Sequence, residues 1–544
     1  RKAVAAVLTA VMVASMFTGC GSDNGSSSAK SASAASAASA ANDTVDEDGK
    51  VNGIMYQEGL PLVDEGDYTF SIFCDDSSES GEFIMLDEFK KQTNVDVDLK
   101  IYPYETATER LNLDLNSGDY ADVIGGWTLS DNAILTYGVN QGVFIPLEDY
   151  FEKYCPNISA ILDLPGVREK MTAPDGHIYT IPYVCTDTTV GYSPYINTKW
   201  LENVGMSMPT TTDEFEAVLK AFKEQDANGN GDASDEIPFS TDPNNKHIEA
   251  MAGYFGLPMN KLGIAIQNEK VVYGGVSDTY REFLSWFHKL YAEGLVDVEL
   301  YTQDSSTWEG KGNQDLYGVS IAYGSNEFTG IPAAEERGDF DSMPVLNTDK
   351  DGIWLRDTEG FSVYRTQAVI TNKAEHPEII CRWFDNAFAL ENGIGCNRGP
   401  VGVIVNKEDD GYHAIDTTTL SEEDQEKYSW GNLWPQSLPK YLPVDFEFVE
   451  EHPMYDEKKA TEEAYEANLT KEIIPSYWID LDKIDTFSDT NTAIKDFFEQ
   501  QQAQFVCGEL DIDNDADWQA YVDGMYSLGL EDWVATQGIE EIAK

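Results

Sequence analysis

From Tyr68 onward the sequence alternates between short strand-like runs and segments with helical periodicity, and this alternation limits the fold more than any other feature. Strands are predicted over 68–74, 95–102 and 121–124, and helices are predicted over 82–92, 107–116 and 133–139. Repeated strand–helix units favour a parallel sheet with right-handed crossovers. The sequence therefore predicts an α/β fold.

Polar and aromatic residues follow the predicted strands. Asp75 and Asp76 come directly after the strand 68–74, and Trp127 follows the run 121–126. In parallel sheets, ligands bind beyond the carboxyl ends of the strands. We therefore expect these three residues at a binding site, although the two acids can also cap a helix and the Trp can also pack in the core.

The chain is too long for a single hydrophobic core. Its 544 residues, of which 42% are hydrophobic, predict two lobes. The chain is expected to cross between the lobes near Thr189 and to return after about residue 325. The predicted N-terminal lobe comprises residues 61–188 with about 326–395, and the predicted C-terminal lobe comprises 189–325 with about 396–544.

The loop 226–236 carries oxygen side chains on alternate residues, with glycines between them. Glycine permits the positive φ angles of a tight coil, and four carboxylates in one short loop repel each other unless a cation lies among them. Oxygen ligands without Cys or His favour Ca²⁺ over zinc or a redox metal. We predict a calcium site formed by Asp226, Asn228, Asn230, Asp232, Asp235 and Glu236.

This loop departs from an EF-hand, because its twelfth position is Ile237 and the acidic residue stands one place earlier, at Glu236. The alternative interpretation is a solvated turn, which Asp, Asn and Gly often form. The predicted helix before the loop begins with a capping box, Thr211 with Glu214. A cation in the loop would hold the exit of this helix, which is a structural role.

The first residues have the features of an export signal. Arg1 and Lys2 precede an apolar run that ends in Thr18-Gly19-Cys20, and this run is shorter than the ~18 residues of a spanning helix. The pattern resembles a bacterial lipoprotein box, in which the Cys becomes lipidated, although Phe17 stands where Leu is usual. The alternative is an ordinary cleaved signal. We expect 1–20 to be the signal, Cys20 the lipidation site and 21–60 a disordered tether.

The net charge argues against several classes of ligand. The sequence has 97 acidic and 36 basic residues, a formal net charge of −61. Such a field repels nucleic acid and anionic membrane surfaces, and it disfavours polyanionic ligands unless a local basic pocket exists. Acidic ligands are therefore less favoured than neutral ones. The simpler interpretation of the charge is a well-hydrated surface.

Motifs of known enzyme chemistry were not found. The seven cysteines show no CxxC pairing, and there is no glycine-rich phosphate loop, no GxSxG and no HExxH. Two functions other than binding and delivering a ligand stay open: a secreted polysaccharide-degrading enzyme and a surface adhesin. A pair of catalytic carboxylates is not excluded by inspection, because so many acids produce chance pairs. The expected protein is nevertheless a binding protein and not an enzyme.

Several segments resemble the extracellular solute-binding lipoproteins of carbohydrate ABC importers, in particular the branch that includes the alginate-oligosaccharide binders. The similarity is carried by 118–124, 142–154, 175–182, 197–205, 209–215, 235–238 and the end of the chain at 508–512, 518–521 and 528–530. It runs from about Tyr68 to the end and is patchy over 260–500. The family's calcium ligands correspond by position to the six residues predicted above. In the alginate binders the loop is one residue shorter before the Asp-Glu pair.

The resemblance implies a two-lobed fold of the periplasmic-binding-protein type, in which each lobe is a mostly parallel sheet flanked by helices, with hinge strands between the lobes. It implies a monomer that captures an oligosaccharide in the interlobe cleft and delivers it to an ABC permease. The protein would lie on the extracellular face of a bacterial, Gram-positive plasma membrane, held only by its lipid anchor. It would bind no nucleic acid, and Ca²⁺ would be structural.

Sugars stack on aromatic rings through their apolar faces and pair through their hydroxyls with polar side chains. For a neutral oligosaccharide, we predict aromatic contacts from six residues, each with core packing as the alternative: Trp127, Tyr183, Trp308, Tyr323, Trp354 and Trp434. The predicted polar contacts are Asp75, Asp76, Asn326 and Arg398, the last of which can also pair with a structural carboxylate.

Overall fold

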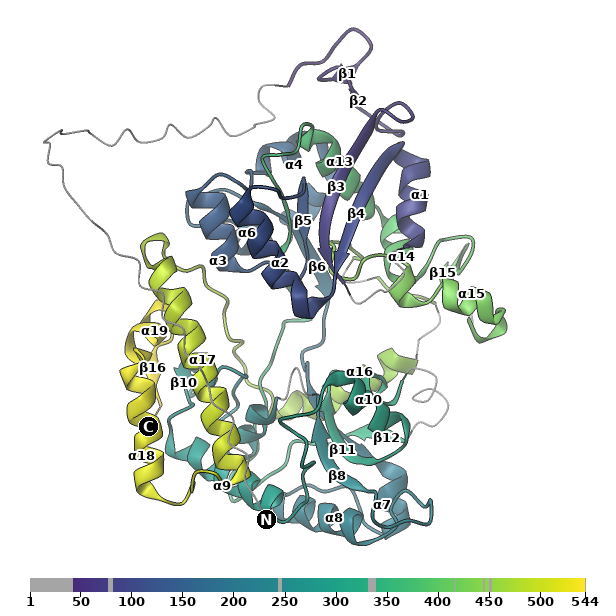
Figure 1. The fold of residues 1–544 in the computed structure, drawn as a ribbon. Coiled ribbons are helices and arrows are strands. Elements are labelled where there is room, and N and C mark those ends of the chain that lie inside the picture. Colours follow the sequence, from purple (N-terminus) through teal and green to yellow (C-terminus); the bar gives the residue numbers. More distant parts are fainter. Residues whose placement is uncertain are drawn as a thin grey trace, which may run out of the picture. The chain divides into compact units, whose positions relative to one another are not determined.

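The computed structural model describes residues 43–76, 82–242, 247–330, 339–415, 417–443, 446–449 and 453–543. Cys20 and the predicted signal lie outside the described residues. The first sheet of the protein has the strand order β4-β3-β5-β13-β6 (Figure 1). The strands are β3 (Tyr68–Asp75), β4 (Val95–Tyr102), β5 (Val123–Gly125), β6 (Thr180–Thr186) and β13 (Phe361–Ile370).

One strand of this first sheet runs against the others. β3 is parallel to β4 and to β5, whereas β13 is antiparallel to both β5 and β6. The carboxyl ends of β3, β4, β5 and β6 therefore lie at one edge, together with the amino end of β13. The predicted strands 68–74 and 95–102 agree with β3 and β4 to within a residue.

Helices cover both faces of the first sheet. Successive side chains of a strand point to opposite faces, so neighbouring residues pack against different helices. Ile72 and Val123 pack in one core cluster with α1 (Ile84–Thr93) and α13 (Pro377–Ala387). Their neighbours Phe73 and Ile124 pack in another cluster with α2 (Tyr104–Ser117). The first lobe is thus a three-layer α/β unit, as the alternation in the sequence predicted.

The second sheet has the order β12-β7-β11-β8. Its strands are β7 (Ser193–Asn197), β8 (Ile237–Thr241), β11 (Tyr317–Ala322) and β12 (Phe340–Ser342). β8 is parallel to β11, and β7 is antiparallel to both β11 and β12. Three of the four strands share one direction, but two of the three strand pairs are antiparallel, so this sheet is mixed and not mostly parallel as predicted.

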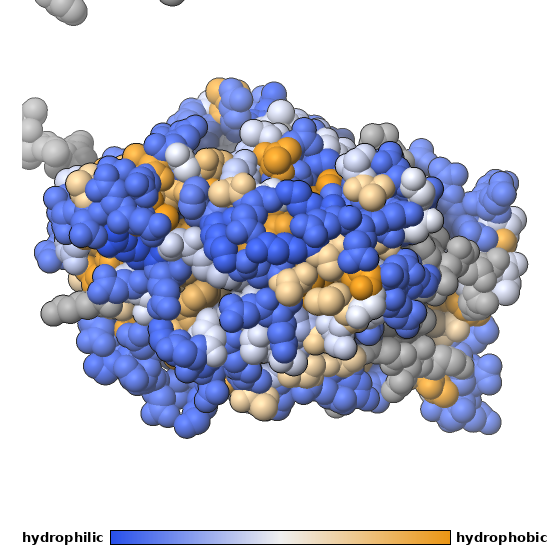
Figure 2. All heavy atoms as spheres, turned by 90° about the horizontal axis from the view of Figure 1, so that it is seen from below, coloured by the Kyte–Doolittle hydropathy of each residue, from blue (hydrophilic) through white to orange (hydrophobic). Residues whose placement is uncertain are grey.

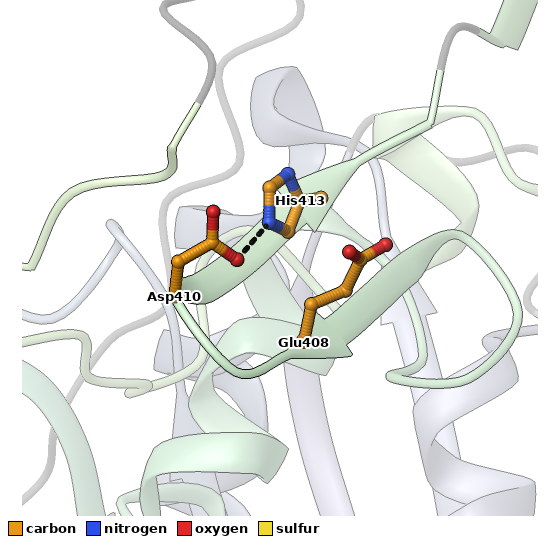
Figure 3. Close-up of side chains that lie close together, drawn as sticks. All are labelled: Glu408, Asp410 and His413. Atoms are coloured by element: carbon orange, nitrogen blue, oxygen red, sulfur yellow. Dashed lines mark hydrogen bonds and ion pairs between the residues drawn. The ribbon is translucent and has the colours of Figure 1, made fainter.

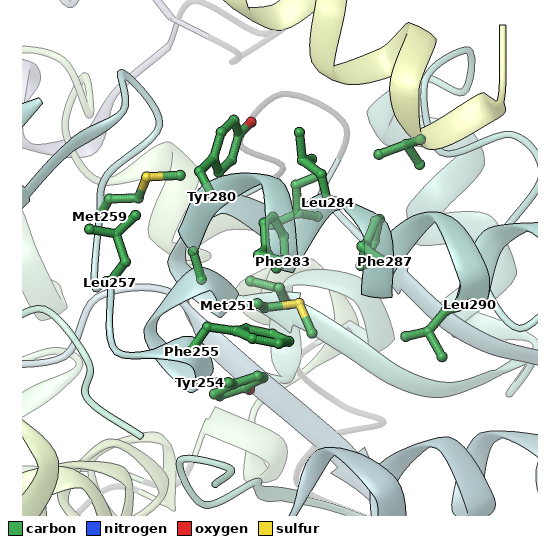
Figure 4. Packing of buried hydrophobic residues seen from close by; sticks show 14 of the residues in the cluster. Met251, Tyr254, Phe255, Leu257, Met259, Tyr280, Phe283, Leu284, Phe287 and Leu290 are labelled. Carbon is green, nitrogen blue, oxygen red and sulfur yellow. The ribbon is translucent and has the colours of Figure 1, made fainter. Parts of the chain in front are cut away.

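The main core of the second lobe lies between this sheet and the helices α8 (Thr212–Glu224), α9 (Asp278–Ala292) and the 3-10 helix η3 (Ile248–Phe255). Phe283 and Phe287 of α9 lie one helical turn apart and point toward Met251 and Phe255 of η3 (Figure 4). α8 begins as predicted, since the Thr211 hydroxyl accepts from the Glu214 N–H.

The remaining elements surround these two sheets. The short strands are β1 (Lys50–Val51), β2 (Met55–Tyr56), β9 (Ile264–Gln267), β10 (Lys270–Tyr273), β14 (Val405–Glu408), β15 (Gly411–Ala414) and β16 (Glu541–Ile542). The helices before residue 400 are α3 (Asp131–Ala133), the π-helix η2 (Ile134–Asn140), α4 (Glu148–Tyr154), α5 (Pro156–Leu162), α6 (Val167–Met171), α7 (Thr198–Val204), α10 (Ser305–Asn313), α11 (Asn326–Thr329) and α14 (Leu390–Arg398). Later helices are η4 (Thr417–Thr419), α15 (Glu422–Lys427), η5 (Trp430–Asn432), α16 (Pro453–Tyr465), η6 (Glu466–Asn468), η7 (Leu481–Lys483), α17 (Ile484–Cys507), α18 (Asp515–Ser527) and α19 (Leu530–Thr536).

Two segments belong to a different part of the fold than the sequence suggested. β12 pairs with β7, so residues 340–342 still belong to the second sheet, beyond the expected return near residue 325. Trp434 and Leu438 pack in the first-lobe cluster, although 396–544 was assigned to the second lobe. Strand pairing over long distances and late returns of the chain leave no local pattern, which explains both differences.

Part of the predicted tether is ordered. β1 pairs with β2, and Val51 and Met55 are fully buried in the first-lobe cluster together with Leu62 and Val63. Residues 43–60 are therefore part of the folded lobe. The low hydrophobicity of this stretch concealed the few apolar side chains that anchor it.

The surface agrees with the acidic composition. On the face that Figure 2 shows, hydrophilic side chains predominate and hydrophobic ones form small separate patches. In the part of the chain that the structure describes, no helix is both long and apolar enough to cross a bilayer.

Trp383 tests the first-lobe core. Its indole is fully buried, and it packs against Phe70, Phe89 and Trp434 with ring centroids 5.3, 5.5 and 5.6 Å away. Replacing Trp383 by Ala should lower the free energy of unfolding by about 3–5 kcal/mol, through lost burial and the cavity left behind. Denaturant unfolding measures this. Tyr526→Ala, at an exposed position on α18, is the control and should change stability by less than about 0.5 kcal/mol.

Candidate functional site

The end of β3 is tied to the end of β5 by a buried carboxylate. Asp75 accepts hydrogen bonds from the backbone N–H groups of Trp127 (2.9 Å) and Thr128 (2.6 Å). Gly126 precedes them with a φ of +138°, and a Cβ there would lie 2.3 Å from Asp75 Oδ1, so only glycine fits. Burial raises the pKa of Asp75. Asp75 is at the predicted edge, but its carboxylate positions the turn that presents Trp127.

Three aromatic rings gather at this edge of the first sheet. Trp127 is 45% exposed and lies 6.4 Å from Tyr183 and 5.3 Å from Tyr364, measured between ring centroids. Tyr183 and Tyr364 are paired across β6 and β13 and stack at 5.6 Å. Two predicted residues, Trp127 and Tyr183, are thus brought together, and Tyr364 joins them.

Asp187 lies just after β6, in the segment that leads to β7. Its carboxylate accepts from the hydroxyls of Ser362 (2.6 Å) and Tyr364 (3.4 Å), which belong to β13, and from Tyr323 (3.1 Å), which follows β11. Burial and the nearby Asp187 raise the pKa of both tyrosines, so the phenols stay protonated and donate. Asp187 therefore joins residues of the two sheets.

Beyond Tyr323 the aromatic contacts continue among residues associated with the second sheet. Tyr192 lies edge-to-face with Tyr323 at 6.1 Å and stacks on His247 at 4.1 Å. The Lys458 ammonium of α16 lies 3.5 Å from the centroid of the Tyr323 ring and donates to the Gly191 carbonyl at 3.2 Å. Burial lowers the pKa of Lys458 to about 8. We call this series, from Trp127 through Asp187 to His247, the aromatic band.

A polar group lies beside the first-lobe end of the band. Asp76 accepts from the Gln436 backbone N–H at 2.7 Å, and the Gln436 side-chain oxygen accepts from Lys440 Nζ at 2.6 Å. Lys440 lies 5.2 Å from the centroid of Trp430, whose indole is 54% exposed. Arg398, at the end of α14, is half-buried, and burial lowers its pKa to about 10. Of the four predicted polar residues, Asp76 is thus connected to Lys440 through Gln436, and the charge of Arg398 adds to the lowering of the Lys440 pKa that burial causes.

The loop 226–236 is closed mostly by its own hydrogen bonds. The side-chain amides of Asn228 and Asn230 donate to Asp235 at 3.2 and 2.7 Å, and Asp232 accepts from Ser234. One oxygen of Asp226 and one of Glu236 are buried and have no hydrogen-bond partner. Burial raises the pKa of Glu236. Two orphaned carboxylate oxygens among hard-oxygen side chains fit a divalent cation.

Comparison with known proteins decides the family. Residues 76–393 match the family of bacterial extracellular solute-binding proteins. This chain belongs to that family.

This solute-binding protein is 31% identical, over 411 residues, to the fructooligosaccharide ABC transporter substrate-binding protein FusA of Streptococcus pneumoniae serotype 4, covering 73% of this chain and 70% of FusA. A structure of an EF-hand mutant of S. pneumoniae FusA in complex with fructo-nystose aligns with a TM-score of 0.74 and 27% identity, over 86% of this chain and 98% of that chain. The alginate-binding protein AlgQ2 without calcium ion aligns with a TM-score of 0.71 and 22% identity, over 88% of this chain and 99% of that chain. The two-lobed α/β fold predicted from the sequence is confirmed.

Three of the predicted aromatic residues are core residues of the solute-binding protein. Trp308 is 3% exposed and donates to the Ser320 hydroxyl, Trp354 is 2% exposed and packs on Tyr254, and Trp434 is fully buried. For these three residues the alternative of core packing holds. Asn326 begins α11, three residues after Tyr323, and is half-buried.

Seven residues of the site were missed in the sequence: Asp187, Tyr192, His247, Tyr364, Trp430, Lys440 and Lys458. Asp187 was detectable, since it follows a strand end as Asp75 does. The others have no local signal, because Trp430 resembles Trp434 in sequence, and the lysines are placed by long-range packing.

Among the described residues, one group of His, Cys, Asp or Glu side chains is close enough to hold a metal ion: Glu408, Asp410 and His413, on the β14–β15 hairpin (Figure 3). The four carboxylates of loop 226–236 do not form such a group. His413 Nε2 pairs with Asp410 at 3.0 Å, and both acids are exposed. In so acidic a chain the ion pair accounts for this arrangement, and we assign no metal to it.

Lys440 makes stability depend on pH. Burial lowers its pKa to about 8, below the usual ~10.4. The unfolded chain therefore holds this proton more tightly than the folded chain does. The buried charge lowers the free energy of unfolding by its full amount below pH 8, and this destabilisation disappears as the pH rises toward ~10.4. Lys440→Met should be more stable than the wild type by at most about 3 kcal/mol below pH 8, and the difference should shrink by pH 10. Denaturant unfolding at several pH values checks this, and a pH-independent difference would contradict it.

Proposed function

We propose that this solute-binding protein captures an oligosaccharide along the aromatic band and presents it to an ABC permease. The observation that carries the proposal is the continuity of the band. Ring contacts run from Trp127 to Tyr364, Asp187 connects Tyr364 to Tyr323, and ring contacts continue to His247. A chain of sugar rings needs such a row of apolar faces with hydrogen-bonding groups between them.

Each residue type in the band suits one part of a sugar. The exposed Trp127 offers its face to the apolar side of a pyranose or furanose ring. Asp187 accepts hydrogen bonds, so hydroxyls of a ligand can replace its contacts with Tyr323 or Tyr364. Because Asp187 holds residues of both sheets, exchanging these contacts would couple ligand binding to hinge motion between the lobes.

We propose a neutral oligosaccharide as the ligand. The net charge of −61 disfavours uronates. FusA binds fructo-oligosaccharides by its name, and this chain covers most of it, so a fructan is the first ligand to test. In this scheme the sugar is released unchanged, and finding cleavage products would instead support the secreted-enzyme alternative.

The proposed partners follow from the family. An ABC permease would receive the sugar from a monomeric binding protein, outside a Gram-positive cell. Cys20 would carry the lipid anchor, and residues 21–42 would form the tether to the folded lobe.

We propose that Asp226, Asn228, Asn230, Asp232, Asp235 and Glu236 hold a structural Ca²⁺. Support comes from the orphaned oxygens of Asp226 and Glu236 and from the EF-hand of FusA. Bound calcium would neutralise these carboxylates and fix the exit of α8. The Asn228 and Asn230 amides would then turn their oxygens, in place of their nitrogens, toward the ion, and Asp232 would be the weakest ligand because Ser234 already binds it.

Trp127 is the first residue to test. Trp127→Ala should weaken binding of fructo-nystose about tenfold or more, because a stacking face is lost. Isothermal titration calorimetry against neutral and acidic oligosaccharides measures this, with Tyr526→Ala as an exposed aromatic control. Unchanged affinity in Trp127→Ala would contradict the proposed location, and wild-type preference for acidic sugars would contradict the proposed ligand.

Chelation separates the two proposed sites. Removing calcium should lower the melting temperature by several degrees and leave sugar affinity at low temperature nearly unchanged. Asp226→Asn should abolish the calcium-dependent rise in melting temperature. Asp410→Asn, in the exposed hairpin cluster, is the matched control and should keep it. If chelation abolished sugar binding before it affected stability, the structural role of the ion would be wrong.

A further inference from the structure

Two Trp side chains are exposed among the residues that the structure describes, and both border the same edge of the first sheet. Trp127 follows β5 and is 45% exposed, and Trp430 begins η5 and is 54% exposed. Burying a large indole is favourable, and an exposed indole forgoes this free energy until a ligand covers it. An exposed indole beside a binding site therefore indicates a ligand-contact surface. The aromatic band uses Trp127 only.

Trp430 is held in place by Gln436. The Gln436 side-chain amide donates to the carbonyl oxygens of Trp430 and Trp434, each at 2.9 Å, and its backbone N–H donates to Asp76. Trp434 is buried in the first-lobe core, so these bonds connect the exposed Trp430 to a rigid part of the fold. Because the backbone that carries the indole is fixed, less conformational entropy is lost when a ligand stacks on Trp430.

Lys440 lies next to Trp430 and has fewer acceptors than its ammonium has donors. Its side chain is only 2% exposed, yet its ammonium carries three N–H donors. Within the described ranges, Gln436 Oε1 is its one hydrogen-bond acceptor, and the Trp430 ring is its one cation–π partner. Burying a cation with unused donors is costly, so oxygen atoms of a ligand are the natural additional acceptors.

Lys440 also adjoins the aromatic band. Gln436 accepts from Lys440 through its side-chain oxygen and donates to Asp76 through its backbone N–H, and the neighbouring Asp75 accepts from the Trp127 backbone N–H. Lys440 and Trp430 therefore lie beside the first-lobe end of the band. A ligand that extends beyond Trp127 at this end of the band would reach Trp430 and Lys440.

We propose that Trp430 and Lys440 form an additional sugar subsite, in which a further ring of the oligosaccharide stacks on Trp430 while its oxygens accept hydrogen bonds from Lys440. This inference rests on the proposed oligosaccharide function and extends it. It makes the protein selective for chain length, because a short sugar can fill the band alone, whereas a longer one also reaches the subsite.

The test is a chain-length series measured by calorimetry with the full chain. The probes are a trisaccharide, a tetrasaccharide and a pentasaccharide of one neutral fructan series. Trp430→Ala and Lys440→Met should each weaken binding of the longest sugar about tenfold and change trisaccharide affinity little. Lys427→Met is the matched control, since Lys427 is an exposed lysine 4.9 Å from the Tyr428 ring, and it should bind every probe as the wild type does.

The outcomes separate the subsite from the band. If Trp127→Ala loses affinity while Trp430→Ala and Lys440→Met bind every probe like the wild type, the subsite is wrong and the proposed function stands. An equal loss for all chain lengths would indicate a purely structural role and would also overturn the subsite. If the wild type binds no neutral oligosaccharide, both proposals fall. Melting temperatures of the variants confirm that each remains folded.

Discussion

The site depends on the buried carboxylate of Asp75. This carboxylate accepts from two backbone N–H groups after β5, and the backbone carbonyl of Asp75 accepts from the Ser437 hydroxyl. Asp75 therefore joins the ends of β3 and β5 to the segment that carries Trp430. A buried carboxylate is stable only when such donors surround it. The close approach also requires Gly126, since any Cβ there would collide with Asp75. The turn that exposes Trp127 is therefore fixed by packing around one charge.

Asp187 has the corresponding role between the sheets. It stands where the chain leaves β6 and accepts from hydroxyls that belong to both sheets. Lys458 lies close by as a buried cation, 3.5 Å from the Tyr323 ring centroid. A few hydrogen bonds to one carboxylate are a modest connection, of about 1 kcal/mol each. Contacts of this strength can be exchanged for ligand contacts, which is what a hinge between binding lobes requires.

The sequence predicted the elements well where a local pattern was complete. β3, β4 and α9 follow from period-two and period-3.6 patterns, and the Thr211 cap follows from its spacing to Glu214. The positions of Asp75, Asp76 and Trp127 followed from the rule for parallel strand ends. The rule gave the location but not the role, since Asp75 binds backbone and not solvent. The sequence predicted four Trp residues as sugar contacts and did not distinguish among them. In the structure Trp127 is exposed, whereas Trp308, Trp354 and Trp434 are buried.

By itself, the sequence determined the α/β class, the two lobes, the family and the cluster of oxygen side chains at 226–236, because periodicity, length and local spacing are properties of the chain alone. Only the tertiary structure decided which aromatic rings are exposed, that β12 still belongs to the second sheet, and that Trp430 and Lys440 return to the edge where Trp127 lies. Those features depend on contacts between residues hundreds of positions apart, such as Asp76 with Gln436. No local pattern encodes such contacts, since they are selected by the packing of whole elements against one another.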